Sequence, residues 1–337
     1  MDWFERLTGF REKSYADTKA KLVVDNGDLR SLANGKSYRT GTLELVSLRD
    51  LRERVKQTCP PSAKSKVSAI TGDIRRMHRS PENVGALFQV ASQFNLLEMI
   101  SPGVTPEDGV GRYEDDRTQG PACAVAAGAA TIYRNYFASV DNNVGQTADR
   151  QLDGLKSLGV ALSAALDTPV EALWKMRNGY ALCTDAGLDQ IAKYLGSLSP
   201  PQLDLFREQL QIGIHSHVEI TDVAQEPRPL VSQAFCSALP VAYTQVPRAK
   251  WTAFASLVLE AAYEATLLAA ALNKKNGGSN VVLLTHLGGG AFGNEPEWIT
   301  GAIRRALSMT SELGLDVKIV SFSHVSEGTS ALVTEFN

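Results

Sequence analysis

The stretch from Leu283 to Trp298 carries glycines at a spacing that suits the binding of an anion. Gly288, Gly290 and Gly293 form a Gly-x-Gly-x-x-Gly pattern between an apolar run that predicts a strand and a segment that predicts a helix. Glycines let backbone N–H groups approach a ligand closely, and the N-terminus of a following helix adds a partial positive charge. The stretch is therefore a candidate phosphate site, and its alternative is a tight turn between a strand and a helix.

Two familiar phosphate-binding folds do not fit this stretch. A nicotinamide-dinucleotide fold places its glycines early and needs an acidic residue about 20 residues further on, at the end of the next strand. Here the next predicted strand ends in Ser323 and His324, and too little chain follows for the remaining strands of such a domain. A P-loop needs Lys followed by Ser or Thr after its last glycine, whereas Gly293 is followed by Asn294 and Glu295.

A loop rich in proline, glycine and acidic residues, spanning 96–120, is the second candidate site. Loops of this length inside a compact domain are usually functional or disordered. When two carboxylates converge, their repulsion raises the pKa of one, which can then act as an acid while the other stays ionised. We expect Asp115 and Asp116 to form the best pair. Asp108 and Glu107 come next, and the alternative is a solvated charge run that keeps the loop soluble.

Hydrophobic patterning predicts strands and helices that alternate along the chain, which indicates an α/β fold. Residues 1–65 mix charge with scattered leucines and predict an N-terminal extension of low regularity. Residues 146–210 predict a helical insertion, in which Trp174 and Tyr180 are expected to lie in a helix core. The predicted strands cover residues 66–74, 85–95, 212–223, 230–243, 280–287 and 316–324, and the other predicted helices cover 120–137, 248–273 and 295–313.

Composition and scattered residues narrow the class of protein. A net charge of -3 gives no electrostatic footprint for nucleic acid. The four cysteines are far apart, and His215 and His217, expected on one face of a strand, lack a third ligand nearby, so we expect neither a metal nor a cofactor. The N-terminus is too charged for a secretory signal, and the apolar run 257–273 carries Glu260 and Glu264 at helical spacing, which favours a buried helix over a membrane span. We expect a soluble protein of the cytoplasm, or of a host cytosol if the chain is a secreted effector.

Three segments, taken in order, resemble the macrodomain family. Residues 71–74 (TGDI), 88–95 (FQVASQFN) and 287–294 (LGGGAFGN) are similar to its adenine, distal-ribose and diphosphate segments. The whole pattern, over about residues 66–325, resembles most the macrodomain hydrolases related to poly(ADP-ribose) glycohydrolase. Within these it is most similar to the group of the Legionella effector MavL, which removes ADP-ribose from the arginine of ubiquitin. The resemblance implies a macrodomain-like three-layer αβα sandwich with a mixed sheet over residues 66–330, interrupted by the helical insertion.

The resemblance also implies roles for individual residues. Asp73 would accept a hydrogen bond from the adenine amine, with the backbone of Ile74 nearby, and Asn95 would contact the distal ribose. Gln119, at the start of the helix after the acidic loop, is placed in the binding site. Without the resemblance, a turn or helix-capping role is the first interpretation of Asp73. The glycine loop would hold the diphosphate, with Phe292 against a ribose or base; it comprises Gly288, Gly289, Gly290, Ala291, Phe292, Gly293 and Asn294.

Two departures from the family pattern bear on the substrate. The triple glycine followed by paired glutamates of the poly(ADP-ribose) glycohydrolases is absent, and the acidic loop stands in its place. The Asn-Ala-Ala-Asn of macrodomains becomes Ser92-Gln93-Phe94-Asn95. Poly(ADP-ribose) chains are therefore not the favoured substrate.

We expect an ADP-ribosyl hydrolase that uses acidic-loop carboxylates to cleave the N-glycosidic bond between ADP-ribose and a protein side chain. The resemblance implies arginine as the side chain and ubiquitin as a candidate carrier. An anionic loop would also attract the guanidinium of arginine. One alternative is a module that binds ADP-ribose without cleaving it. Another is a site for a different nucleotide diphosphate derivative, such as O-acetyl-ADP-ribose.

Overall fold

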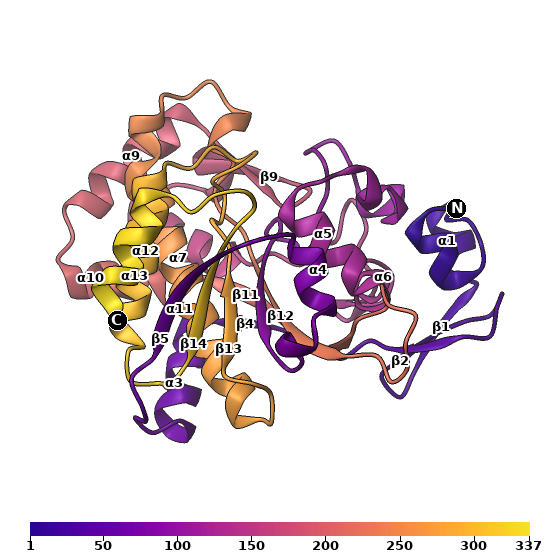
Figure 1. Ribbon diagram of the computed structural model, residues 1–337. Coiled ribbons are helices and arrows are strands. Elements are labelled where there is room, and N and C mark those ends of the chain that lie inside the picture. The colour runs from indigo at the N-terminus through magenta and orange to yellow at the C-terminus, as the bar shows by residue number, and fades with distance from the viewer.

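A mixed seven-stranded sheet forms the centre of the computed structural model, which describes residues 1–337 (Figure 1). Its strand order is β4–β11–β12–β6–β13–β14–β5, and only β11 runs against the others. The central strands β12, β6 and β13 are almost wholly buried, as expected of parallel strands covered on both faces. The strands are β4 (Thr42–Ser47), β5 (Lys66–Thr71), β6 (Leu87–Ala91), β11 (Gln211–Glu219), β12 (Leu230–Cys236), β13 (Val281–Leu284) and β14 (Asp316–Ser321).

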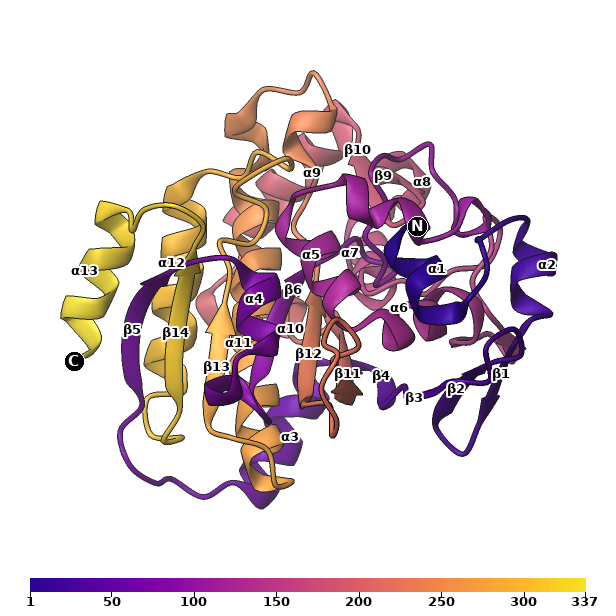
Figure 2. The same cartoon turned by 45° about the vertical axis from the view of Figure 1, so that its right-hand side comes forward.

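Helices cover both faces of this sheet and complete three layers (Figure 2). The prediction of an α/β fold with a mixed sheet between helical layers is confirmed. One predicted helix, 120–137, is in fact two, because Ala127 leaves the helical conformation at φ -112° and ψ 57°. One face carries α3 (Leu48–Thr58), α11 (Thr252–Lys275) and α12 (Pro296–Met309), the other carries α4 (Ile74–Arg79), α5 (Gln119–Ala126) and α6 (Gly128–Tyr136), and α13 (Glu327–Phe336) packs beside the edge strand β5.

The long helix α11 lies in the core. With the turn before it, the helix Arg248–Lys275 is long and apolar enough to cross a membrane by length and composition, with a mean hydropathy of 1.4. In this fold 83% of its most apolar window is buried, and four strands of the sheet pack against it. Its buried Glu264 accepts hydrogen bonds from Arg52 of α3 and Arg305 of α12. That carboxylate connects three helices, and the prediction that this segment is a buried helix is confirmed.

The first 65 residues are more regular than the sequence suggests. Residues 42–58 form β4 and α3, which belong to the main sheet and its covering layer, and β4 pairs with β11 across the expected boundary near residue 65. The expectation of an irregular segment was wrong because the strands of this segment are short and mix exposed with buried positions, so they lack a long apolar run. The preceding elements are α1 (Trp3–Thr8), α2 (Tyr15–Lys19) and a small sheet of β1 (Leu22–Asp25), β2 (Asp28–Ser31) and β3 (Ser37–Arg39).

The segment 146–210 contains a hairpin as well as helices. Trp174 and Tyr180, expected in a helix core, lie instead on its two strands, β9 (Trp174–Arg177) and β10 (Tyr180–Cys183). Asn178 and Gly179 form the turn at φ of 48° and 79°, which is the Asn-Gly signal of a two-residue hairpin. The helices of this segment are α7 (Lys156–Leu166), α8 (Val170–Leu173), α9 (Asp185–Gly196) and α10 (Pro200–Arg207), and a two-residue pair, β7 (Ser139–Val140) and β8 (Asn143–Val144), precedes it.

The loops that follow β12, β6, β13, β14 and β5 meet at one edge of the sheet, because these five strands are parallel. Ligands of open α/β sheets bind at this carboxyl edge. The loop after β6 is the acidic loop, which contains two short 3-10 turns, Pro106–Asp108 and Gly111–Asp115. The loop after β13 is the glycine loop. The fold therefore brings together two stretches that lie far apart in the sequence.

Candidate functional site

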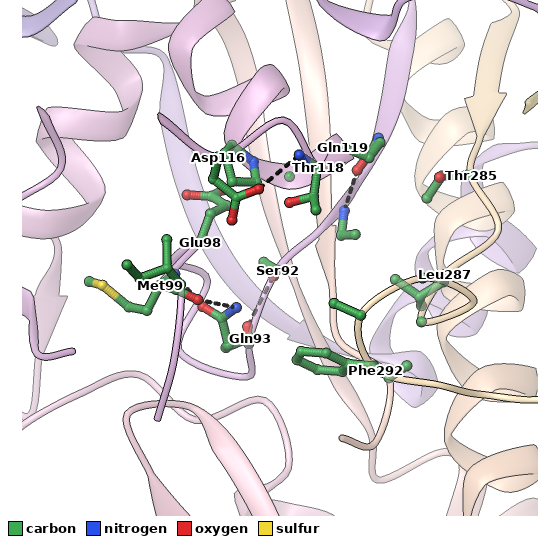
Figure 3. Close-up of a pocket in the computed structure, with 18 of the residues that line it drawn as sticks. Ser92, Gln93, Glu98, Met99, Asp116, Thr118, Gln119, Thr285, Leu287 and Phe292 are labelled. Atoms are coloured by element: carbon green, nitrogen blue, oxygen red, sulfur yellow. Dashed lines mark hydrogen bonds between the residues drawn. The ribbon is translucent and has the colours of Figure 1, made fainter. Parts of the chain in front are cut away.

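A cavity of about 200 Å³ opens at the carboxyl ends of β12, β6 and β13 (Figure 3). Its walls come from the residues after β6, the end of the acidic loop, the first turn of α5, the β9–β10 hairpin and the glycine loop. The residues of the predicted site that line it are Asp116, Gln119, Gly288, Gly290, Ala291 and Phe292.

Three consecutive residues of the glycine loop that line this cavity have unpaired backbone N–H groups. Gly288 and Gly293 adopt φ of 75° and 70°, and Gly293 N donates to Gly290 O at 3.0 Å, which closes the loop. The N–H groups of Gly290, Ala291 and Phe292 have no acceptor in the protein. Consecutive free N–H groups in a tight loop can form a concave anion site. The loop can therefore hold a phosphate or a diphosphate.

Three members of the predicted loop, Gly289, Gly293 and Asn294, do not line the cavity. Asn294 is buried, its Nδ2 donates to Leu239 O at 2.8 Å, and its N–H donates to Gly288 O at 3.0 Å. This side chain fixes the loop against the end of β12 and leaves the anion site to the backbone.

Gly288 is the position at which the loop tolerates a side chain least. A Cβ there would overlap the Cβ of Ala238 and lie 2.7 Å from Asn294 Nδ2, at a left-handed φ of 75°. We expect Gly288→Ala to lower the free energy of unfolding by about 2 kcal/mol and to weaken anion binding at the loop. Gly290→Ala is the matched control, because its Cβ meets no atom within 4 Å. Equal thermal unfolding midpoints for the two variants would contradict this account of the loop.

The start of α5 lies directly against β6. Gln119 Oε1 accepts a hydrogen bond from Ala91 N at 2.8 Å, and its Nε2 donates to Gln89 O at 2.8 Å. The amide thus pairs with the strand backbone as a neighbouring strand would. A Cβ on Gly120 would overlap Ala91 O, so this close approach requires glycine. Gln119 lies in the cavity wall as predicted, with both polar atoms of its side chain engaged in placing the helix.

The acidic loop brings one of its predicted carboxylates to the cavity. Asp116 lines it, and its Oδ1 accepts a hydrogen bond from Thr118 N at 2.8 Å, immediately before α5. Asp115 lies instead in an adjoining open groove, with Arg112 and Arg117, and these three charged side chains have no ion-pair partner in the protein. Asp116 lines both hollows and so stands at their junction.

Glu107 and Asp108, the second predicted pair, lie away from the cavity. Both carboxylate oxygens of Glu107 accept from Ala148 N, at 2.9 and 2.8 Å. Asp108 accepts from Thr105 N at 2.8 Å and caps the turn Pro106–Asp108. The structure therefore gives these two carboxylates a role in shaping the loop and does not bring them to the cavity.

Glu98 is a second carboxylate in the cavity wall, which the sequence analysis does not single out. It is buried, and the equally buried Arg134 donates from Nη2 to Glu98 Oε1 at 3.1 Å. Burial raises the pKa of Glu98 to about 7, and the guanidinium of Arg134 opposes the rise. The sequence holds a signal for it, since Glu98 is the one charged residue in the apolar run 94–100, and a charge in such a run is buried and paired.

Glu98 and Asp116 lie on the same side of the cavity, across from Thr285 and Leu287 (Figure 3). One carboxyl is buried with a raised pKa, and the other is half-buried and accepts a backbone hydrogen bond. Two carboxyl groups in such different surroundings can serve one reaction as proton donor and ionised partner.

An aromatic wall adjoins the anion site. The ring centroids of Tyr180 and Phe292 are 5.3 Å apart, and Tyr243 lies 5.2 Å from Tyr180 and 5.5 Å from Phe292. Tyr180 OH donates to Met99 O at 2.6 Å and accepts from Gln93 Nε2 at 3.3 Å, which fixes the wall to the residues after β6. Phe292 thus lines the cavity and also anchors the glycine loop.

Asn95 lies outside the cavity, and its neighbours Ser92 and Gln93 line it instead. Asn95 is buried, its Nδ2 donates to Gln151 Oε1 at 2.8 Å, and its Oδ1 accepts from Leu97 N at 3.1 Å. Both polar atoms therefore hold the turn after β6, and the structure does not bring this side chain to the candidate ligand site.

Asp73 and Ile74 lie further along the same edge of the sheet, after β5. Asp73 is the N-cap of α4, and its Oδ1 accepts from the N–H groups of Arg75 and Arg76 at 2.8 and 3.3 Å. The capping role is thus present, while Oδ2 makes no hydrogen bond within the protein. Ile74 is buried. Phe322, which directly follows the neighbouring β14, has 81% of its surface exposed. The sequence analysis does not identify Phe322 as a candidate site residue, because it lies in the apolar pattern of a predicted strand.

The two strand histidines do not form a pair. His215 is buried, whereas His217 lies within a bulge of β11 and adopts φ 56°. The bulge breaks the alternation of side chains that the sequence suggests, so the two imidazoles do not share a face. No group of three or more His, Cys, Asp or Glu side chains is arranged to hold a metal ion.

No protein-family model matches this chain, and no curated protein matches it in sequence. Solved structures of poly(ADP-ribose) glycohydrolases are similar to it. The enzyme from Deinococcus radiodurans in complex with ADP-ribose is 14% identical over 87% of this chain and 92% of that one, with a TM-score of 0.43. The enzyme from Thermomonospora curvata is 11% identical over 96% and 98% of the two chains, with a TM-score of 0.44. Identities this low leave the residues at the site free to differ, so they must be considered on their own chemistry.

Proposed function

We propose that this chain binds ADP-ribose at the carboxyl edge of its sheet and hydrolyses the N-glycosidic bond between ADP-ribose and a protein side chain. The preferred side chain is arginine, with ubiquitin as a candidate carrier. The observation that carries the proposal is one cavity in which three consecutive free N–H groups, of Gly290, Ala291 and Phe292, are combined with two carboxyl groups, Glu98 and Asp116. The first set suits a diphosphate and the second suits glycoside chemistry.

The diphosphate would occupy the glycine loop, where the free N–H groups would stabilise negative charge. The distal ribose would then lie in the cavity against the aromatic wall of Tyr180, Tyr243 and Phe292. The adenine would extend along the sheet edge toward β14 and β5. There Phe322 offers an exposed ring for stacking, and Asp73 Oδ2 is free to accept from the adenine amine.

The chemistry needs a water molecule, a carboxylate and a proton donor at the anomeric carbon. Water attacks the anomeric carbon, the carbon–nitrogen bond breaks, and the products are ADP-ribose and the unmodified side chain. We assign Asp116 to accept the proton of the attacking water and to stabilise positive charge on the ribose in the transition state. Glu98, with its raised pKa, would donate a proton to the departing nitrogen.

Selection of arginine would come from the groove beside the cavity. Asp115 and Asp116 place two carboxylates there, and Asp115 has no partner within the protein. A guanidinium forms its strongest hydrogen bonds with carboxylates, so a modified arginine is favoured over serine or glutamate at this opening. Arg112 and Arg117 in the same groove would contact acidic residues of the carrier protein.

The direct test is incubation with ubiquitin ADP-ribosylated on arginine, followed by measurement of free ADP-ribose. Parallel incubations with serine-linked and glutamate-linked conjugates and with poly(ADP-ribose) establish the side chain. Calorimetric titration with ADP-ribose, AMP and NAD measures the binding site separately. Release of ADP-ribose from the arginine conjugate alone supports the proposal in full. Tight binding of ADP-ribose with no release from any conjugate would show a binding module instead of a hydrolase.

We also propose that the protein acts in the cytoplasm, because its four cysteines are free thiols and such thiols persist in a reducing compartment.

A further inference from the structure

Glu12, in the segment between α1 and α2, reaches into the acidic loop. Its Oε1 accepts a hydrogen bond from Val110 N at 2.9 Å, and its Oε2 accepts one from Gly111 N at 2.6 Å. The hydroxyl of Tyr136, from α6, donates to Oε1 at 2.8 Å. A half-buried carboxylate thus receives three hydrogen bonds, two of them from the backbone of a loop 98 and 99 positions away in the sequence.

The loop is shaped around this carboxylate. Gly109 adopts φ 80°, and a Cβ on it would overlap the carboxyl group of Glu12. A Cβ on Gly111 would lie 2.9 Å from Glu12 Oε2. The two glycines are therefore explained by the approach of Glu12, since a side chain at either position would push the carboxylate out.

A second contact from the same N-terminal segment holds the other end of the turn Gly111–Asp115. Glu114 accepts from Trp3 N at 2.8 Å and from Arg6 Nη2 at 2.6 Å. Trp3 also packs in one apolar cluster with Tyr113 of this turn. The first twelve residues thus fix both ends of the turn, and the next residue after it is Asp116.

The side chain of Glu12 makes no hydrogen bond or ion pair besides these three hydrogen bonds, from Val110, Gly111 and Tyr136. Burial raises its pKa, while the hydrogen bonds from Val110 and Gly111 oppose the rise. Burying a carboxyl group costs free energy unless its hydrogen bonds are satisfied, and here those bonds order a loop of the candidate site. Elsewhere the acidic loop is held near residues 106–108 and by the buried Tyr113, whose hydroxyl accepts a hydrogen bond from Glu98 N at 3.2 Å.

We propose that Glu12 is a positioning residue, which holds the turn Gly111–Asp115 so that Asp116 faces the cavity in its working orientation. The proposal rests on the proposed hydrolase function for its effect on turnover. The ordering of the loop is a property of the fold and can be measured without turnover.

The test compares Glu12→Gln with Glu5→Gln, a matched change on the same segment. Glu5 contacts only Arg11, at 3.6 Å, through its side chain. In Glu12→Gln an amide N–H replaces one acceptor and faces a backbone N–H, so one loop hydrogen bond is lost. Hydrogen exchange of residues 109–117 and tryptic cleavage after Arg112 and Arg117 report loop order, calorimetry reports ADP-ribose affinity, and release from the arginine conjugate reports kcat and KM.

We expect Glu12→Gln to speed exchange and cleavage in this loop and to lower kcat about tenfold, because small misplacements of catalytic groups are costly. ADP-ribose affinity should stay within about twofold, since the glycine loop is untouched, and Glu5→Gln should match the wild type throughout. Tyr136→Phe removes only the third hydrogen bond and should fall between the two. A merely structural role would lower affinity, kcat and thermal stability together.

Two outcomes overturn the inference. Unchanged exchange in Glu12→Gln shows that the carboxylate does not order the loop, and faster exchange with unchanged kcat shows that its order does not matter for turnover. If the wild type releases no ADP-ribose, the proposed function fails. Exchange then decides whether Glu12 orders the loop: equal exchange in Glu12→Gln and Glu5→Gln overturns that part as well, and faster exchange in Glu12→Gln alone retains it.

Discussion

Asp116→Asn should lower kcat for release of ADP-ribose from the arginine conjugate by about 10³-fold, and ADP-ribose affinity should stay within about threefold. The amide keeps an oxygen for the hydrogen bond from Thr118 N, so the loop before α5 keeps its shape. What is lost is the negative charge and the basic oxygen at the junction of cavity and groove. Single-turnover kinetics and calorimetry measure the two quantities.

The chain supplies two matched controls for this change. Asp115→Asn alters a groove residue that does not line the cavity, so it should raise KM several-fold while kcat changes little. Asp108→Asn alters a capping residue of the same loop and should leave both constants near the wild type. If Asp116→Asn keeps wild-type kcat, or if Asp115→Asn loses as much of it, Asp116 is not the residue that acts on water.

Glu98→Gln should abolish the pH dependence of turnover above neutrality as well as most of the turnover itself. With the pKa of Glu98 raised to about 7, the proton-donating form is present below that pH and disappears above it. Wild-type kcat should therefore fall as the pH rises through about 7. The kcat of the variant should not change with pH in this range and should be at least about 10²-fold lower than that of the wild type. A profile that keeps the same limb in Glu98→Gln would assign the acid to another group.

Stability gives a second readout for Glu98, independent of turnover. The folded-state pKa, about 7, exceeds the ordinary value of 4.5, so the folded protein binds this proton more tightly than the unfolded chain. The resulting stabilisation is complete below about pH 4.5 and is lost as the pH rises through about 7. Glu98→Gln should lack this component and, because it leaves Arg134 buried without its partner, should unfold about 3 kcal/mol more easily at neutral pH. Denaturant unfolding at several pH values measures both effects.

Much of the architecture follows from local pattern. The parallel strands that end at Ala91 and Leu284 are short apolar runs, and the long helix with Glu264 is apolar along most of its length, so both predict burial between layers. The glycine loop can also be predicted from the sequence, because several glycines directly after a strand indicate either a phosphate site or a tight turn. The hairpin could also have been predicted from Asn178-Gly179, but the apolar and aromatic residues on either side were assigned to a helix core.

The candidate site was predicted only in part, because its members come from segments far apart. The acidic loop offers five carboxylates between residues 107 and 116, and nothing in their spacing says which one faces inward. Packing decides it: Glu107 and Asp108 make local bonds at one end of the loop, Glu114 pairs with Arg6, and Asp116 remains at the cavity. Glu98 was passed over because a lone carboxylate in an apolar run gains its partner, Arg134, only through the fold.

The sequence by itself determined the α/β class, the glycine-rich loop of residues 288–293 and the presence of a carboxylate-rich loop. These depend on residue type and near-neighbour spacing, which act through the local backbone. Only the tertiary structure decided that Asp116 and Glu98 share a cavity with the glycine loop and that Asn95 does not reach it. It also decided that Glu12 holds the acidic loop. The physical reason is that hydrogen bonds and ion pairs between residues distant in the sequence form only when the folded chain brings them together.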